Sequence, residues 1–103
     1  KLAEKLIHGK HYGMSKTRWE MQSRGLDKNL IEDILAEYTD DEIDEEIMRL
    51  LRTKYAEKLS DPDDRRRTVA ALARRGYSYG AVKRCIEAAL ADEEDFDPDE
   101  FEE

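Results

Sequence analysis

Basic side chains gather in one short stretch of this 103-residue chain and are its best candidates for chemistry. Positions 65 to 84 contain no aspartate or glutamate, and the basic residues there are Arg65, Arg66, Arg67, Arg74, Arg75, Lys83 and Arg84. Guanidinium and ammonium groups bind phosphate and carboxylate oxygens. The stretch is therefore a candidate contact for a partner surface or for nucleic acid. The alternative is that Arg67 provides solubility and that Arg74 and Arg75 stabilise the last turn of a helix through its dipole.

Other clusters lack the spacing that catalysis or metal binding requires. His8 and His11 lie three positions apart, but no carboxylate or cysteine is in register with them and Gly9 interrupts the helix. We interpret them as ordinary surface histidines rather than metal ligands. The acidic run Asp40–Glu46 lacks the internal glycine of a calcium loop, and we interpret it as a solvated helix start. Without a glycine-rich phosphate loop or a nucleophile–histidine pair, we expect neither an enzyme nor a cofactor or small-molecule substrate.

The basic stretch predicts two short helices joined by a turn at Arg75-Gly76-Tyr77, and a similar pattern occurs 51 residues earlier. Subtracting 51 pairs residues of the same kind: Thr68 with Thr17, Leu72 with Met21, Arg75-Gly76 with Arg24-Gly25, Val82 with Ile31, Cys85 with Ile34, and Ile86 with Leu35. A helix stop and apolar spacing that recur at one separation indicate a repeated supersecondary unit.

Apolar spacing and capping residues predict the other helices. After the closing turns of a helix at 1–8, helix starts are predicted at Met14, Asp27, Thr39, Ser60 or Asp61, and Ser78. The predicted fold is all-α, with tandem three-helix repeats in an elongated array. Its expected divisions are a first repeat with a truncated first helix at 1–38, a second repeat at 39–91, and an acidic disordered tail at 92–103.

The amino-acid sequence of the repeat resembles that of one protein family. TRWEMQSRGLDKNLIEDIL, LLRTKYAEKL and TVAALARRGYSYGAVKRCI, in this order, resemble the second half of the RecX regulatory proteins, over about residues 6 to 90. The resemblance implies a tandem of three-helix units, of which this chain has the last two. It also implies binding to the RecA nucleoprotein filament and modulation, with inhibition expected, of recombinase activity in DNA repair, recombination and the SOS response. The chain has no initiator methionine and begins inside a predicted helix, so we expect a fragment.

The predicted helix faces divide packing residues from contact residues. In the helix after Pro62, the residues Thr68, Val69, Leu72 and Ala73 face inward, while Arg67 and Arg74 face outward with Ala70 and Ala71 between them. In the first repeat, Lys16 and Trp19 lie opposite the apolar stripe. A lone tryptophan in so small a protein is expected in the core, with a partner contact as the alternative. We expect Tyr77 between the repeats, Tyr79 free to stack on a partner, and Cys85 in a packing role.

Charge and composition narrow the class of partner. Positions 92 to 103 contain nine acids and no lysine or arginine, so the net charge of -8 leaves +1 for the rest of the chain. Such a chain is a poor free-standing DNA ligand, since phosphate neutralisation provides most non-specific affinity. We therefore favour the RecA filament as partner, with single-stranded DNA met within it. The alternative is a free-standing DNA-binding module.

Composition also indicates the cellular compartment of the protein. A single cysteine, Cys85, agrees with a reducing cytosol, and no long apolar run predicts a membrane contact. We expect a cytoplasmic protein.

Overall fold

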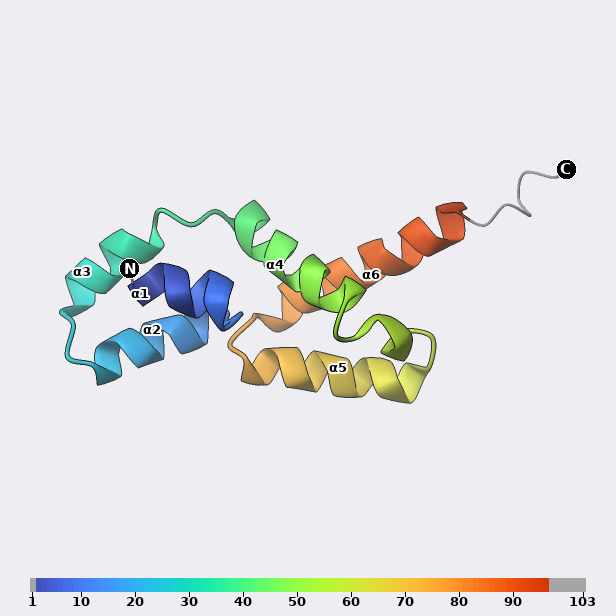
Figure 1. Cartoon of the computed structure of the whole chain (residues 1–103), viewed down its shortest axis with the longest axis horizontal. Helices are drawn as coiled ribbons and strands as arrows, with labels where there is room; N and C mark the ends of the chain where they lie inside the picture. The colour runs from blue at the N-terminus through green and yellow to red at the C-terminus, as the bar shows by residue number, and fades with distance from the viewer. Residues whose placement is uncertain (1, 97–103) are drawn as a thin grey trace, which may run out of the picture.

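The computed structural model of the chain describes the backbone of residues 2–96 and the side chains of residues 2–91. In this part of the chain, helices and turns form without a strand (Figure 1). The elements are α1 (Leu2–Glu4), a π-helical turn (Lys5–Gly9), α2 (Met14–Ser23), α3 (Lys28–Leu35), α4 (Asp40–Arg52), a 3₁₀ turn (Ala56–Lys58), α5 (Pro62–Arg74) and α6 (Tyr79–Phe96). The all-α prediction is confirmed, and none of these helices is long and apolar enough to span a membrane.

The predicted caps begin four of the helices. Ser78 Oγ accepts a hydrogen bond from the Ala81 N–H at 3.2 Å at the start of α6. Asp27 accepts hydrogen bonds from the backbone N–H groups of Asn29 and Leu30 at the start of α3. Thr39 accepts one from the Glu42 N–H at the start of α4, and Asp61 accepts one from Asp64 ahead of α5. Each cap satisfies a donor that has no partner within the helix.

Identical turns end α2 and α5. Gly25 and Gly76 have positive φ angles of 87° and 99°, a conformation that favours glycine. The N–H groups that follow them bond five residues back, from Leu26 to Met21 and from Tyr77 to Leu72, both at 3.2 Å. These are Schellman endings, in which glycine lets the chain satisfy the last carbonyls of the helix and turn into the next one.

Burial follows the 51-residue repeat. Five pairs of residues related by this separation are buried or packed against the core in both halves. Thr17 and Thr68, Met21 and Leu72, Ile31 and Val82, and Leu35 and Ile86 are all buried, whereas Cys85 is buried and its equivalent Ile34 is half-buried. The two halves therefore share one packing pattern, as expected for a helical repeat. Burial also raises the pKa of the Cys85 thiol to about 11, which agrees with the predicted packing role.

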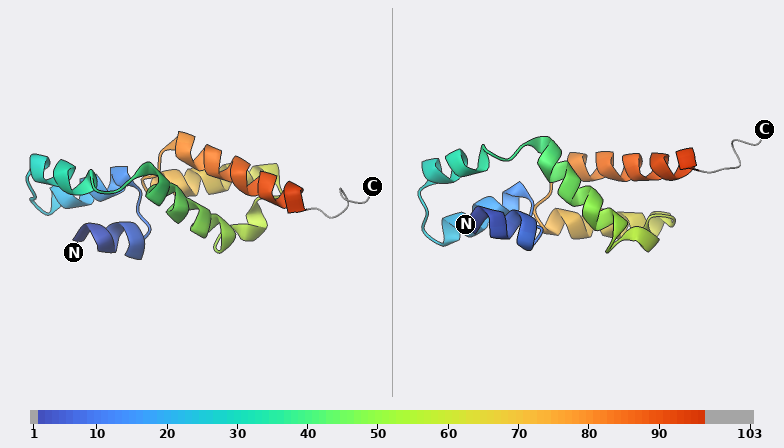
Figure 2. Two further views of the ribbon diagram at one scale, coloured as in Figure 1. Left: turned by 90° about the horizontal axis from the view of Figure 1, so that it is seen from above. Right: turned by 45° about the horizontal axis from the view of Figure 1, so that its top comes forward.

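Helix α4 provides a large part of the common core. Its apolar stripe, predicted from the sequence, is buried throughout: Ile43, Ile47, Leu50, Leu51 and the following Tyr55. The helix packs against α6, and Figures 1 and 2 show it crossing α6 after the connection from α3. The assembled helices measure 59 × 25 × 20 Å, so the array is elongated, as predicted.

The start of α2 abuts the turn between α5 and α6. The N–H of Gly13 donates to the carbonyl of Arg75 at 2.7 Å, and the N–H of Ser15 donates to the carbonyl of Gly76 at 3.3 Å. The Arg75 guanidinium in turn donates to the Lys10 carbonyl at 3.0 Å. Tyr77, predicted to lie between the repeats, is buried at this junction. Backbone groups of one half thus satisfy those of the other.

Two packing predictions were wrong. Trp19 is 61% exposed, because no described element covers the side of α2 opposite its apolar stripe. In α5, Ala73 is exposed and Ala71 is half-buried, the reverse of the prediction. The buried face of α5 is turned toward Ala71, which packs against the core, and toward the half-buried Arg75.

The last helix runs past its predicted end. The backbone of α6 continues beyond Ala91 to Phe96, so the helix includes the first residues of the predicted acidic tail. The rest of that tail, 97–103, lies outside the described residues. The predicted division between the repeats falls at Tyr38 and Thr39, in the connection between α3 and α4, and remains a prediction.

Candidate partner-binding surface

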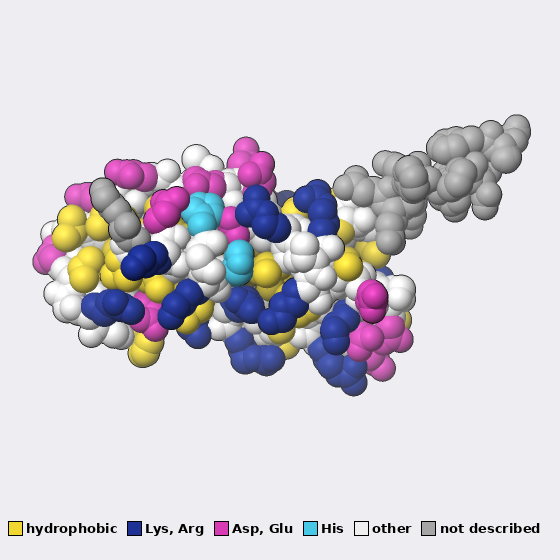
Figure 3. All heavy atoms as spheres, in the orientation of Figure 1, with side chains coloured by type: hydrophobic (Ala, Val, Ile, Leu, Met, Phe, Trp, Pro, Cys, Tyr) yellow, Lys and Arg dark blue, Asp and Glu magenta, His cyan; other side chains and the backbone are white. Residues whose placement is uncertain are grey.

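The predicted contact residues are distributed over three helices. Lys16 and Trp19 lie on α2, Arg65, Arg66, Arg67 and Arg74 lie on α5, Arg75 follows it, and Tyr79, Lys83 and Arg84 lie on α6. Of these, Lys16, Arg65 and Arg75 are half-buried and the others are exposed. Figure 3 shows basic side chains along the lower half of the molecule, over α2 and α5. A positively charged surface therefore extends across both halves.

Acidic side chains from outside the basic stretch neutralise part of this surface. Arg66 pairs with Asp63, and Arg67 Nη1 lies 2.8 Å from Asp64 Oδ1, one helical turn before it. Arg84 reaches Asp44 on α4 at 2.9 Å. Exposed ion pairs are worth about 0–1 kcal/mol, so a partner can displace them at small cost. The expectation of an uninterrupted basic strip was nevertheless too simple.

The remaining cations are the strongest candidates for a contact. Among the described side chains, Arg65, Arg74 and Lys83 form no ion pair. Lys83 lies over the ring of Tyr79, with its Nζ 5.9 Å from the ring centroid, and Lys16 lies 4.7 Å from that of Tyr12. These cations keep their charge available for an acidic partner.

Four of the predicted contact residues line one groove. Arg65 and Arg66 from α5 and Tyr79 and Lys83 from α6 surround a space of about 330 Å³ between the two helices. The antiparallel course of α5 and α6 brings together residues that the sequence separates by a turn. Trp19, Arg67 and Arg74 do not line this groove, so the structure does not gather the predicted residues into one site.

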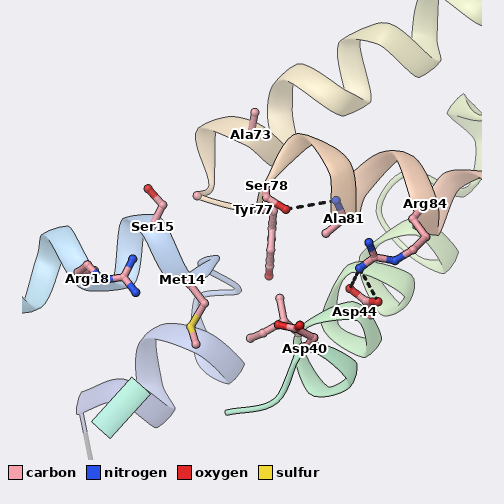
Figure 4. A pocket seen from close by; sticks show the side chains of 12 residues that line it. Met14, Ser15, Arg18, Asp40, Asp44, Ala73, Tyr77, Ser78, Ala81 and Arg84 are labelled. Carbon is pink, nitrogen blue, oxygen red and sulfur yellow. Dashed lines mark hydrogen bonds and ion pairs between the residues drawn. The ribbon is translucent and has the colours of Figure 1, made fainter. Parts of the chain in front are cut away.

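A second pocket, missed from the sequence, lies at the junction of the repeats. Its volume is about 580 Å³, and Figure 4 shows the Tyr77 ring between Met14 of α2 and Asp40 of α4. Its two arginines already bind carboxylates: Arg18 pairs with Glu32 at 2.7 Å, and Arg84 pairs with Asp44. Both arginines therefore join helices at this pocket, Arg18 of α2 to α3 and Arg84 of α6 to α4.

The Tyr77 hydroxyl in this pocket is buried and has no hydrogen-bond partner in the described structure. Burial, with a smaller contribution from the negative charge of Glu46, raises the pKa of Tyr77 well above its usual value. The phenol is therefore neutral at physiological pH, and its ring packs at the junction between the two halves.

A charged cluster also joins the two halves, and the interpretation of its histidines as ordinary surface residues was wrong. His8 Nδ1 lies 2.5 Å from Glu46 Oε2, and His8 Nε2 lies 3.0 Å from Glu42 Oε2. His11 Nδ1 lies 3.0 Å from Glu46 Oε1, and Arg49 donates to the same carboxylate. Glu46 is only 2% exposed, so it does not belong to a solvated helix start. No local pattern of residues indicated this cluster, because α4 brings the acids to the histidines from more than 30 positions away.

The cluster favours charged forms of both partners. The hydrogen bond to Glu46 raises the pKa of His8, although partial burial opposes it. Burial alone would raise the pKa of Glu46, but hydrogen bonds from His8 and His11 outweigh it and lower that pKa. Both nitrogens of His8 face carboxylates and can donate together only in the imidazolium form. No group of three or more potential metal ligands occurs among the described residues.

We expect the free energy of unfolding to depend on pH through this cluster. The raised folded-state pKa of His8 means that its contribution is complete below about pH 6.5 and is lost as the pH rises through the folded-state value. The lowered pKa of Glu46 gives a contribution that is present above about pH 4.5 and is lost as the pH falls through its folded-state value. The two contributions coincide between these limits.

Urea unfolding of the protein and of His8→Gln across this range tests the expectation. The difference in unfolding free energy should be largest near pH 5.5 and should shrink as the pH rises beyond the folded-state pKa of His8. A difference that stays constant with pH would contradict this assignment.

The fold and its surface define a helical-repeat protein built from three-helix units. Residues 40–86, which extend from α4 into α6, match the family described as RecX, third three-helix domain. A Regulatory protein RecX from Herbaspirillum seropedicae is 26% identical over 97 residues, which cover 92% of this chain and 62% of the relative. Both comparisons agree with the resemblance to the RecX regulatory proteins that the sequence predicted.

The share of the relative that the chain covers limits which of its properties can be assigned to this chain. The chain spans 62% of the length of that relative, so the activity of a whole RecX protein is a matter of proposal for this chain. No solved structure matches the chain. The role of each predicted contact residue stays a prediction.

Proposed function

We propose that this chain binds the RecA nucleoprotein filament and restrains its recombinase activity. The observation that carries the proposal is a 59 Å helical array, in a chain similar to RecX, with exposed cationic and aromatic side chains in both halves. A stack of short repeats offers an elongated surface that contacts successive subunits of a filament. Restraint follows when one chain holds neighbouring protomers in a fixed arrangement.

The equivalent helices α2 and α5 provide the proposed contacts. Lys16 and Trp19 project from α2, and Arg67 and Arg74 project from α5, which the repeat relates to α2. Trp19 is the exposed aromatic anchor of this surface, and large aromatic residues with arginine dominate the energy of protein interfaces. The surface thus combines an anchor in one half with cations in the other.

Free-standing DNA binding is the less favoured alternative. Three of the predicted cations, Arg66, Arg67 and Arg84, pair with carboxylates, and positions 92–103 add nine acids. This charge distribution weakens the electrostatic attraction on which non-specific DNA binding depends. In the proposed complex, the remaining cations meet DNA only where RecA already holds it.

Fluorescence anisotropy tests the choice of partner. The chain, labelled at its N-terminus, is titrated with single-stranded DNA alone and with RecA assembled on the same DNA with a nonhydrolysable nucleotide. We expect saturable binding to the filament and much weaker binding to bare DNA. Equal affinity for both would favour the DNA-binding alternative, and binding to neither would contradict the proposal.

A further inference from the structure

The groove between α5 and α6 has a positively charged rim. Arg65 and Arg66 line it from α5 and Lys83 lines it from α6, against a single carboxylate, Glu87. Arg65 and Lys83 form no ion pair among the described side chains, and the pair between Arg66 and Asp63 is exposed. The rim therefore favours a ligand with several negative charges.

The floor of the same groove is apolar. Val69 and Leu90 are half-buried and Ile86 is buried, while Tyr79 is 62% exposed at the side. Apolar surface beneath a charged rim suits a ligand that carries a hydrophobic side chain between acids. The volume of about 330 Å³ accommodates a single large side chain with the backbone beside it.

The chain itself contains a segment that combines several acidic residues with a hydrophobic side chain. Positions 97–103 read DPDEFEE, with five acids, no lysine or arginine, and one aromatic residue, Phe101, among the acids. Its charge is opposite to that of the groove rim. An intramolecular segment also has a high effective concentration, which an independent peptide lacks.

The segment is long enough to reach the groove. Leu90 and Pro62 line the end of the groove nearest the last turn of α6. Leu90 precedes Phe96 by six residues, or about 9 Å of helix, and Lys83 precedes it by thirteen, or about 20 Å. Phe101 follows Phe96 by five residues, which span about 17 Å when extended, so a chain that turns back after Phe96 brings Phe101 over Leu90 and Ile86. The two glutamates after Phe101 extend this reach to about 24 Å, which is enough for a carboxylate to meet Lys83.

We propose that the groove between α5 and α6 binds the acidic segment 97–103 of the same chain, with Phe101 against the apolar floor and its acidic neighbours on Arg65 and Lys83. The segment then covers cations that a polyanionic partner would otherwise contact. This inference goes beyond the proposed function, because the contact forms without RecA or DNA and is tested without them.

Amide chemical shifts of full-length variants test the contact. In the first variant, the five acids of 97–103 become the corresponding amides, and in the second, Phe101→Ala removes the anchor. Both should shift the amide signals of Val69, Lys83 and Ile86, and leave those of α2 and α3 unchanged. Arg65→Glu with Lys83→Glu should abolish the response to the amide changes. Lys28→Glu with Lys58→Glu changes two exposed cations that do not line the groove and should retain it.

The outcomes separate the possible occupants. An intramolecular contact gives chemical-shift changes that do not depend on protein concentration. These changes should also disappear at about 1 M salt, where the Debye length is about 3 Å and the charges are screened. Changes that grow with concentration would assign the groove to the segment of a second copy and overturn the proposal. Unchanged groove signals in both variants would overturn it as well.

Discussion

Gly13→Ala is expected to destabilise the protein by about 3 kcal/mol or more, the upper end of the cost of overpacking. A Cβ on Gly13 would lie 2.3 Å from the carbonyl carbon of Gly76 and 2.4 Å from the N of Tyr77. These are backbone atoms, so they cannot rotate aside as a side chain would. The φ and ψ angles of Gly13, -76° and 176°, suit alanine, and the cost therefore comes from the contact alone.

Two other glycines provide matched controls for this substitution. A Cβ on Gly9 or on Gly80 meets no atom within 4 Å, so alanine at either position should leave the free energy of unfolding nearly unchanged or raise it. Urea unfolding followed by circular dichroism gives the comparison. If Gly13→Ala is as stable as Gly80→Ala, the start of α2 does not pack against the α5–α6 turn as described.

Local features were predictable from the sequence because the signals that create them are local. The glycines that end α2 and α5 and the caps Asp27 and Thr39 act within one turn of helix. The repeat added a second source of information, since the buried stripe of one half could be checked against the other. Helix type, order and most core residues followed from these signals.

Contacts between the halves could not be predicted, because they depend on how the helices meet. Glu46 looked like part of a solvated acidic run, yet it is buried against His8 and His11. Arg84 looked like a free cation, yet it reaches Asp44 on α4. Trp19 looked like a core residue because of its size, and only the absence of a covering element among the described residues leaves it exposed. A single sequence carries the periodicity of each helix but not the rotation of one helix against the next.

The partner-binding surface should depend most strongly on α5. We expect Arg67→Glu combined with Arg74→Glu to weaken binding to the RecA filament about 100-fold or more, a loss of about 2.7 kcal/mol in binding free energy. Both side chains are exposed, and Arg74 forms no ion pair among the described side chains. Their reversal should therefore change the melting temperature little, since an exposed pair such as that of Arg67 and Asp64 contributes about 0–1 kcal/mol.

A control of equal charge distinguishes a contact on α5 from a general electrostatic effect. Lys28→Glu with Lys58→Glu reverses two exposed cations elsewhere, and either double variant changes the net charge from -8 to -12 because each substitution removes one positive and adds one negative charge. Long-range repulsion from an acidic partner would weaken both variants to a similar degree, with a loss that salt reduces. A direct contact would weaken only the α5 variant, since the lost hydrogen bonds of a guanidinium act at short range. Equal anisotropy titrations for the two variants would show that Arg67 and Arg74 contribute only their charge, and the contact would have to lie elsewhere on the array.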